Sequence, residues 1–246
     1  MFKSERLFKS FTQQICVCAT STNLICANSS AEMRKIMKNP WEDVSLEDYE
    51  NHMKLSTIQQ LPTLNNIMKS QLNKYNSSTV SILGVAGGNG LEHVDMSRIK
   101  IVYGIDINQK YLDICKEKYQ NLNAILVLKQ LDISILTNKL PMTDILIANL
   151  IIEYIGIDIF IKQISTIFPS YVSIVIQKNT DIKFISDSPY ARSFDGISAI
   201  HRDIEKNSLI DSMSTIGYHL IYTKEHILPN KKKFIRLDFT FVEDNK

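Results

Sequence analysis

The chain between residues 79 and 177 alternates between two hydrophobic patterns. Short runs of nearly continuous apolar residues are separated by segments in which apolar residues recur every three or four positions. The continuous runs are typical of buried strands, and the three-to-four spacing is typical of helices. The runs expected as strands cover residues 79–85, 99–106, 123–132, 143–152 and 171–177. Buried strands that alternate with helices predict a parallel sheet with helices on both faces.

The C-terminal part follows a different pattern. A helix is expected over residues 203–217, and two long strands are expected over residues 218–228 and 233–242. A short turn joins these strands, so they form a hairpin and one of them runs antiparallel to the rest of the sheet. The predicted fold class is therefore α/β, with a doubly wound, mostly parallel, seven-stranded Rossmann-like sheet and an antiparallel C-terminal hairpin.

Two helices are expected before the sheet. Ser45 and Asp48 have the spacing of an N-terminal capping box. A second helical pattern covers residues 55–75, in which Pro62 either kinks the helix or begins a new segment. The segment 39–76 is therefore expected to be a helical cap. The apolar residues that share a face of its first helix are Leu46, Tyr49 and Met53.

Residues 1–38 show no periodicity that persists. We expect them to be a disordered extension, with Met33 and Met37 as alternative starts, and we expect residues 39–246 to form one domain. Basic residues followed by small residues resemble a secretion signal, which remains an alternative. Polar residues, however, interrupt the apolar stretch that such a signal needs.

Composition narrows the choice of partners. The chain is 44% hydrophobic and 22% charged, which is ordinary for a globular protein. A net charge of +2 does not favour a nucleic-acid partner, and the basic cluster from Lys231 to Lys233 is expected to be a solvated turn between two strands. No apolar run has the length of a transmembrane helix. We expect a cytoplasmic monomer or homodimer without a membrane partner.

The cysteines predict neither a metal site nor a disulfide framework. They form no Cys-x-x-Cys pair and have no histidine nearby. A reducing compartment is therefore the expected one, and Cys115 is expected to pack inside a helix. The four cysteines are Cys16, Cys18, Cys26 and Cys115.

The first apolar run ends in a cluster of glycines. Gly87, Gly88 and Gly90 lie within four positions, although the chain has only 8 glycines among 246 residues. Glycine adopts positive φ and lets a ligand approach the backbone closely. Ligands of doubly wound sheets bind at the carboxyl ends of strands, where the strand order reverses. One glycine would suit a tight turn without a ligand, whereas three favour a binding site.

Polar side chains follow the next three strands. Asp106 ends the second strand, 16 residues after Gly90, which is the place of a carboxylate that binds ribose hydroxyls. The alternative is that Asp106 caps the following helix. Asp132 follows the third strand beside Leu131, and Asn149 ends the fourth. The pattern predicts a nucleoside ligand, either a dinucleotide or S-adenosylmethionine.

The order and spacing of these motifs resemble those of class I S-adenosylmethionine-dependent methyltransferases. The segments that carry the resemblance are ILGVAGGNGLEHV, VYGIDINQKYLDIC, LKQLDIS and DILIANLIIEYIG. The resemblance covers roughly residues 40–246 and includes the closing hairpin. The segment PWEDVSLEDYENHMKL resembles the lid-like N-terminal helices of members that act on small molecules.

The resemblance implies a role for each motif. The glycine turn passes around the methionine and ribose parts of S-adenosylmethionine, and the acid at the end of the second strand binds the ribose. The residues after the third strand flank the adenine, and the amide after the fourth lies near the sulfonium. The residues implied to bind the cofactor are Tyr49, Gly84, Ala86, Gly88, Gly90, Asp106, Ile107, Leu131, Asp132 and Asn149.

Two positions depart from the family pattern. The family usually has an acidic residue where Gly84 stands and a glycine where Ala86 stands. Without the acidic residue, the amino group of the cofactor needs another partner. Tyr49 or His52 from the N-terminal helices is expected to help hold it.

The acceptor is expected to be a small molecule, and a protein side chain is the alternative. The fourth strand ends in ANLII, without the Pro-Pro-aromatic motif of enzymes that methylate base amino groups. The polar loop at residues 178–204 is expected beside the methyl group. Glu153 and His201 are the candidate catalytic residues, because either can remove a proton. Their alternative roles are a solvated residue and an ordinary polar residue, each at the start of a helix.

Three functions remain open from the sequence. The first is an enzyme that transfers a methyl group from S-adenosylmethionine to a small molecule. The second is an NAD-dependent oxidoreductase, which Asp106 favours and the segment AGGNG disfavours. The third is a protein that binds S-adenosylmethionine without catalysis.

Overall fold

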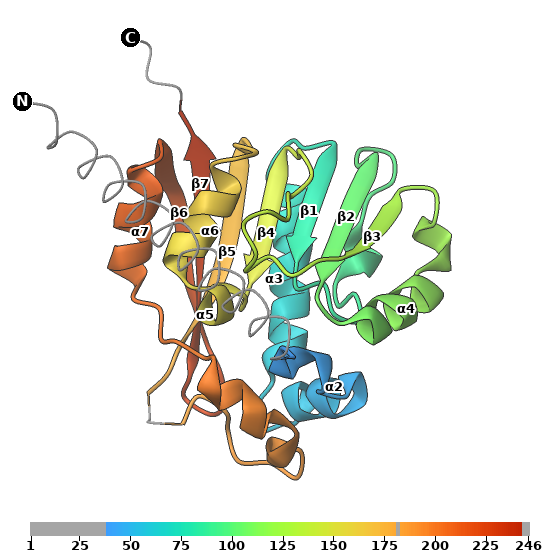
Figure 1. Cartoon of the computed structure of the whole chain (residues 1–246), viewed down its shortest axis with the longest axis vertical. Coiled ribbons are helices and arrows are strands. Elements are labelled where there is room, and N and C mark those ends of the chain that lie inside the picture. Colours follow the sequence, from blue (N-terminus) through green and yellow to red (C-terminus); the bar gives the residue numbers. More distant parts are fainter. Residues whose placement is uncertain (1–37, 181–182, 243–246) are drawn as a thin grey trace, which may run out of the picture. The chain divides into compact units, whose positions relative to one another are not determined.

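A seven-stranded sheet forms the centre of the molecule (Figure 1). The structure is a computed structural model that describes residues 38–180 and 183–242. The strand order is β3-β2-β1-β4-β5-β7-β6, and only β7 runs antiparallel to its neighbours. The strands are β1 Thr79–Leu83, β2 Ile101–Asp106, β3 Leu126–Gln130, β4 Ile145–Asn149, β5 Tyr171–Lys178, β6 Tyr218–Ile227 and β7 Lys233–Phe241. The predicted fold class is confirmed, including the C-terminal hairpin.

Helices cover both faces of this sheet. Helices α5, α6 and α7 lie on one face, and α3 and α4 lie on the other. The α-helices are α2 Leu46–Lys54, α3 Gln60–Lys74, α4 Gln109–Lys118, α5 Ile152–Ile155, α6 Ile157–Ile164 and α7 Lys206–Ser214. The 3-10 helices are η1 Pro40–Glu42, η2 Leu91–His93, η3 Gln120–Leu122 and η4 Ala191–Ala199. None of the helices in the described part of the chain is long and apolar enough to cross a membrane.

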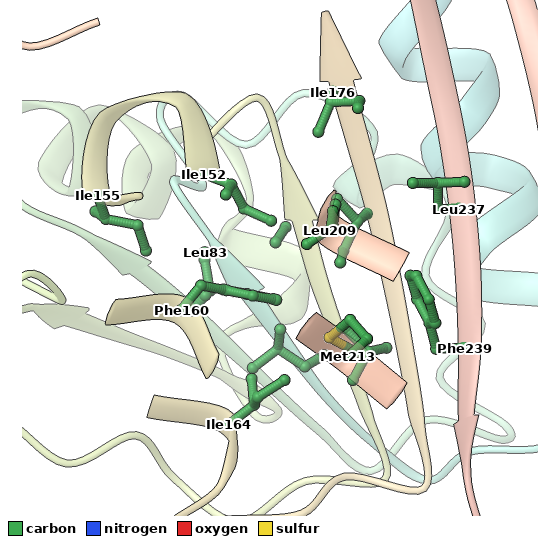
Figure 2. Packing of buried hydrophobic residues seen from close by; sticks show 14 of the residues in the cluster. Leu83, Ile152, Ile155, Phe160, Ile164, Ile176, Leu209, Met213, Leu237 and Phe239 are labelled. Atoms are coloured by element: carbon green, nitrogen blue, oxygen red, sulfur yellow. The ribbon is translucent and has the colours of Figure 1, made fainter. Parts of the chain in front are cut away.

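Alternation along the strands builds the two cores. Successive strand residues point to opposite faces, so Leu83 packs under α5 and α6 while its neighbour Ile82 packs under α3 and α4. Figure 2 shows Phe160 and Met213, from α6 and α7, among the strand side chains of the first core. Both side chains are fully buried, and each such burial contributes about 1.5–3 kcal/mol to folding.

The N-terminal helices begin where the sequence predicts. The Ser45 hydroxyl accepts a hydrogen bond from the N–H of Asp48, 3.5 Å away, and caps α2. Pro62 is the third residue of α3. It therefore begins a new segment rather than kinking a longer one, because a proline in the first turn removes no helical hydrogen bond. The helical cap expected over residues 39–76 corresponds to η1, α2 and α3.

Two local expectations are wrong. Strand β3 lies at the edge of the sheet and is half exposed, with Val127 at 39% exposure, so it is not buried on both faces. Lys232 is not a solvated turn residue but is only 1% exposed. Its Nζ donates hydrogen bonds to the backbone carbonyls of Lys183 and Phe184, which satisfy the buried ammonium.

Expectations for the extension at residues 1–38 fall almost entirely outside the described residues, and so do three of the four cysteines. Those expectations stay predictions. The fourth cysteine, Cys115, is fully buried in α4 as expected. Burial raises the pKa of its thiol to about 11, so at neutral pH the side chain acts as an apolar packing group.

Candidate active site

The sheet order places the ends of β1 and β4 side by side. Strand β1 continues to β2 on one side and β4 continues to β5 on the other, so this is the point where the strand order reverses. A cavity of about 50 Å³ lies here. Its lining includes Gly84, Ala86 and Gly87 from the turn after β1, Asn149 from β4, and Glu50 from α2. We call it the turn cavity.

Asp106 holds the turn after β1 in place. One carboxylate oxygen accepts a hydrogen bond from the N–H of Ala86 at 2.9 Å, and the other accepts from the N–H of Asn108 at 2.9 Å. The side chain is 9% exposed, and this burial raises the pKa of the carboxyl even though the hydrogen bonds oppose the rise. Asn108, and not Asp106, is the residue that caps α4.

Gly88 and Gly90 pack against side chains of the core and do not face the turn cavity. A Cβ on Gly88 would lie 2.8 Å from the sulfur of Cys115, and a Cβ on Gly90 would lie 2.5 Å from Cγ of Met68. Both glycines also have positive φ, at 83° and 94°. Neither lines the turn cavity. In this structure they let helices α4 and α3 approach the turn.

Gly87 faces helix α2 instead. A Cβ at this position would lie 2.9 Å from Oε1 of Glu50 and 2.9 Å from Cδ2 of Leu46. The other carboxylate oxygen of Glu50 forms an ion pair with Lys54 at 2.8 Å. Helix α2 therefore closes over the glycine turn and brings one carboxylate to it.

Asn149 is fixed by a reciprocal amide pair. Its side-chain oxygen accepts from Gln71 at 2.9 Å and its side-chain nitrogen donates to Gln71 at 2.9 Å. Gln71 is 1% exposed and also donates to Ser173 at 2.9 Å. Ser173 in turn donates to Asp238 at 2.5 Å, and a bidentate pair joins Asp238 to Arg236. A buried polar network thus orients the amide at the end of β4.

The residues expected around an adenine lie elsewhere. Ile107, Leu131 and Asp132 are all partly buried, and none of them lines the turn cavity. One carboxylate oxygen of Asp132 accepts hydrogen bonds from the N–H and the hydroxyl of Ser134, at 2.9 and 2.6 Å. In this structure Asp132 stabilises the turn after β3.

A second cavity of about 70 Å³ lies beside the first. Tyr49 and Leu150 are partly buried, and Tyr49 lines both cavities. The aromatic rings that line this second cavity come from four separate segments of the chain, and we call it the aromatic cavity. The aromatic residues that line it are Trp41, Tyr49, His52, Tyr154, Phe184, Phe194 and His201.

The rings of the aromatic cavity contact one another in a continuous series. Trp41 makes edge contacts with Tyr49 at 5.7 Å and with Tyr154 at 5.0 Å between centroids. Phe184 stacks on His201 at 3.9 Å, and His201 meets Tyr154 at 5.9 Å. Aromatic pairs at these separations are mutually stabilising, so the cavity has a rigid apolar wall.

Glu153 brings a carboxylate to this wall from α5. It is 2% exposed, so its alternative role as a solvated residue is wrong. One carboxylate oxygen accepts from the N–H of Gln177 at 2.8 Å. The other oxygen is buried without a hydrogen-bond partner among the described residues. Burial raises the pKa of Glu153 to about 7, and the charge of Asp203 adds to the rise.

His201 and His52 line the same cavity. His201 does not start a helix, because α7 begins at Lys206. One ring nitrogen of His52 lies 2.7 Å from the Ser188 hydroxyl. Burial lowers the pKa of both imidazoles and the ammonium of Lys232 adds to the fall, while at His201 the charge of Asp203 opposes it. Both histidines are therefore neutral at neutral pH.

Several site residues were not predicted from the sequence. Glu50 and Gln71 are set by contacts with Gly87 and Asn149, more than 30 positions further along the chain. Phe184 is set by its stacking on His201, 17 positions away, in the aromatic cavity. The hydrophobic periodicity places Gln71 on the same helix face as Ile67, one turn further along, but it predicts no role in a site. At Phe184 there is no periodic pattern. No local signal distinguishes these residues from surface or core residues.

Comparisons with known proteins agree with the fold. No protein-family model matches the sequence, and no curated protein matches it. Among solved structures, magnesium protoporphyrin IX methyltransferase (ChlM) from Synechocystis PCC 6803 with bound SAM matches with a TM-score of 0.53 and 12% identity, over 75% of this chain and 79% of that one. A putative S-adenosylmethionine dependent methyltransferase from Listeria monocytogenes matches with a TM-score of 0.52 and 17% identity, over 72% and 97%.

A third match limits what the fold alone can say. The [4+2]-cyclase SpnF matches with a TM-score of 0.56 and 11% identity, over 77% of this chain and 85% of that one. The chain thus has the fold of the class I S-adenosylmethionine-dependent methyltransferases. Since one neighbour with this fold is named as a cyclase, the reaction must be argued from the site.

Proposed function

We propose that this protein transfers a methyl group from S-adenosylmethionine to a small molecule. The observation that carries the proposal is the pairing of two cavities at one end of the sheet. The turn cavity lies at the point where the strand order reverses, and the aromatic cavity lies beside it, with Tyr49 in the wall of both. A transfer reaction needs its two reactants to be held next to each other and away from water.

The residues of the turn cavity fit the cofactor. Asp106 does not line this cavity, but its hydrogen bond to the N–H of Ala86 holds the turn that does. It remains the proposed partner of the ribose hydroxyls. The turn at Gly84 and Ala86 presents backbone without large side chains. When bound, S-adenosylmethionine supplies an electrophilic methyl group. Leu131, Asp132 and Ile107 remain proposed neighbours of its adenine.

We assign the missing acidic group to Glu50. Gly84 stands where the family has an acidic residue, and no carboxylate follows β1 directly. The Glu50 oxygen that faces Gly87 lies over the same turn but comes from α2. It is a better partner for the amino group of the cofactor than Tyr49 or His52, because a carboxylate forms a charge-assisted hydrogen bond with an ammonium group.

Helix α2 then acts as a lid. The two cavities measure about 50 and 70 Å³, whereas pockets for small molecules usually measure about 300–1,000 Å³. Binding of a nucleoside-sized cofactor therefore needs these cavities to widen, and α2 is the element that we propose moves. Such lids open and close to admit substrates and exclude water.

The aromatic cavity is the proposed acceptor site, with Glu153 and His201 as the groups that move a proton. We expect the enzyme to act in the cytoplasm as a monomer or homodimer, without a nucleic-acid partner. The net charge of +2 supports the absence of a nucleic-acid partner, because a nucleic-acid site would need a basic surface.

Calorimetric titration with S-adenosylmethionine, S-adenosylhomocysteine and NAD tests the proposal. We expect both adenosyl compounds to bind and NAD not to bind. The variant Glu50→Gln should weaken S-adenosylmethionine binding about tenfold or more, since a charge-assisted hydrogen bond contributes about 1.5–3 kcal/mol. Glu47→Gln, an exposed change on the same helix, is the matched control. Binding of NAD alone would replace the proposal with the oxidoreductase.

A further inference from the structure

We propose that the aromatic cavity binds an organic amine as its cation, with the nitrogen beside the free carboxylate oxygen of Glu153. This inference rests on the proposed function, since it names the substrate class of the acceptor site. Two independent features of the cavity carry it: a carboxylate oxygen with no hydrogen-bond partner among the described residues, and a wall in which seven of the fourteen described lining residues carry aromatic rings.

The first feature is the unpartnered oxygen. Glu153 is 2% exposed, and among the described residues only one of its carboxylate oxygens accepts a hydrogen bond, from the N–H of Gln177. A buried polar atom without a partner costs about 1–3 kcal/mol of stability. A protein tolerates this cost where a ligand supplies the missing donor. An ammonium group supplies both a donor and the opposite charge.

The second feature is the aromatic wall. Trp41, Tyr154 and Phe184 line the same cavity as Glu153. The face of an aromatic ring carries negative charge and attracts a cation within about 6 Å of its centroid, which is how proteins recognise ammonium ligands. Rings and a carboxylate together favour a cation over a neutral or anionic molecule of the same shape.

Other charged and titratable groups near Glu153 are consistent with this assignment. Asp203, on the segment before α7, adds negative charge. His52 and His201 are neutral at neutral pH because burial and Lys232 lower the pKa of both. The Lys232 ammonium is itself 1% exposed and donates to two backbone carbonyls, so it is held outside the cavity lining.

The cavity also suits the chemistry of the transfer. An alkylammonium ion has no lone pair, so it must first give a proton to the Glu153 carboxylate, which becomes a neutral carboxylic acid. The nitrogen lone pair then forms the bond to the methyl carbon while the carbon–sulfur bond breaks, and the electron pair of that bond stays on sulfur. The products are an N-methylammonium ion and a neutral thioether.

The single tryptophan allows a direct binding test. Trp41 is the only tryptophan of the chain and lines the cavity, so its fluorescence reports occupancy. At pH 8 the protein is titrated with two amines, 2-phenylethylamine and butylamine. The neutral counterparts are 2-phenylethanol and butanol, and the anionic one is 3-phenylpropionate. Each titration is run with and without S-adenosylhomocysteine. We expect one amine or both to bind at least tenfold more tightly than their counterparts.

Variants separate a charge effect from a loss of structure. Glu153→Gln keeps an oxygen for the N–H of Gln177 and should lose at least tenfold in amine affinity, with alcohol affinity and S-adenosylhomocysteine binding unchanged. Asp187→Asn removes a charge that is 87% exposed and should change neither. Phe184→Leu, a second variant, should weaken amines more than alcohols.

Two results would overturn the inference. The first is equal affinity for amines and alcohols, and the second is a lack of response to both amines in a protein that binds S-adenosylhomocysteine. Failure of the proposed function looks different. In that case S-adenosylhomocysteine does not bind, whether or not the amines do.

Discussion

The carboxylate of Asp106 accepts a hydrogen bond from the N–H of Ala86, 2.9 Å away, although Asp106 ends β2 and Ala86 lies in the turn after β1. This bond fixes the backbone where a cofactor has to approach. It also gives Asp106 a structural role besides the proposed ribose contact, and the two roles predict different measurements.

Replacing Asp106 by Asn should lower both stability and cofactor affinity. The amide keeps one acceptor oxygen, so one of the N–H groups of Ala86 and Asn108 loses its partner. Charge-assisted hydrogen bonds contribute about 1.5–3 kcal/mol each, and we expect a loss of stability of that size in urea unfolding. Calorimetry should show at least tenfold weaker S-adenosylhomocysteine binding. Asp113→Asn, an exposed change on α4, is the control. Unaltered S-adenosylhomocysteine binding by a folded Asp106 variant would contradict the proposed contact with the ribose.

Ala86 itself is strained. Its φ of 46° lies in the left-handed region, which costs a residue with a Cβ roughly 1–2 kcal/mol. Ala86→Gly should therefore raise the free energy of unfolding, by up to about 1 kcal/mol after the greater entropy of the unfolded glycine is subtracted. Ala124 lies in an exposed turn without positive φ, so Ala124→Gly should lower stability by about 0.4–1 kcal/mol. Equal losses in both variants would show that the turn relaxes in solution.

Alanine variants of Gly87 and Gly90 distinguish an effect on the proposed lid α2 from an effect on the hydrophobic core. In Gly90→Ala the new Cβ lies 2.7 Å from Cβ of Met68 at a φ of 94°, so we expect a loss of about 1–3 kcal/mol. In Gly87→Ala the three atoms nearest to the new Cβ are at the ends of the Glu50 and Leu46 side chains on α2.

Gly87→Ala should therefore shift α2 with little effect on the core. The expected result is near-normal urea unfolding, several-fold altered S-adenosylmethionine affinity and faster proteolysis within α2. If Gly87→Ala lowers stability as much as Gly90→Ala, then α2 is part of the core and does not act as a lid.

Most of the fold could be predicted from the sequence because its signals are local. The apolar run before Gly84 and the helical spacing of Tyr111, Leu112 and Cys115 each specify an element without reference to the rest of the chain. Edge position is not local. The apolar residues of β3 predict burial, but among the described residues no further strand pairs with the outer edge of β3.

The site was only partly predictable for the same reason. Asp106, Asn149 and Glu153 follow strands whose carboxyl ends meet at one edge, so their place could be predicted from strand order. The burial of Glu153 could not, because it depends on β5 and on η4 more than 20 positions later. The glycine cluster correctly indicated that other groups pack closely against the backbone of the turn. At Gly88 and Gly90, however, these groups are the side chains of Cys115 and Met68 rather than a ligand in this structure.

The buried Glu153 carboxylate predicts a characteristic dependence of stability on pH. Its pKa is about 7 in the folded protein, against about 4.3 for an unperturbed glutamate. Between these values the folded state binds a proton that the unfolded state has released. Stability therefore falls as the pH rises from about 4.5 to about 7 and levels off above, by about 3 kcal/mol from this group.

Glu153→Gln should remove this fall. Near pH 4.5 both residues are neutral, and the variant and the parent protein should have similar free energies of unfolding. Above pH 7 the variant should be more stable, by up to about 3 kcal/mol. The measurement is the difference between the free energies of unfolding of the two proteins in urea from pH 4.5 to 8.5, in which the titration of His52 and His201 largely cancels.

Two further variants identify the source of the difference. Asp203→Asn removes a charge that raises the pKa of Glu153, so the pH at which the difference appears should move to a lower value. Asp187→Asn removes an exposed charge and should give no comparable gain at pH 8. A gain in stability together with a loss of amine binding is expected where a strained group is kept for function rather than for folding. A difference that stays flat across the pH range would show that Glu153 is ionised and solvated in the folded protein, and it would remove this residue from the acceptor site.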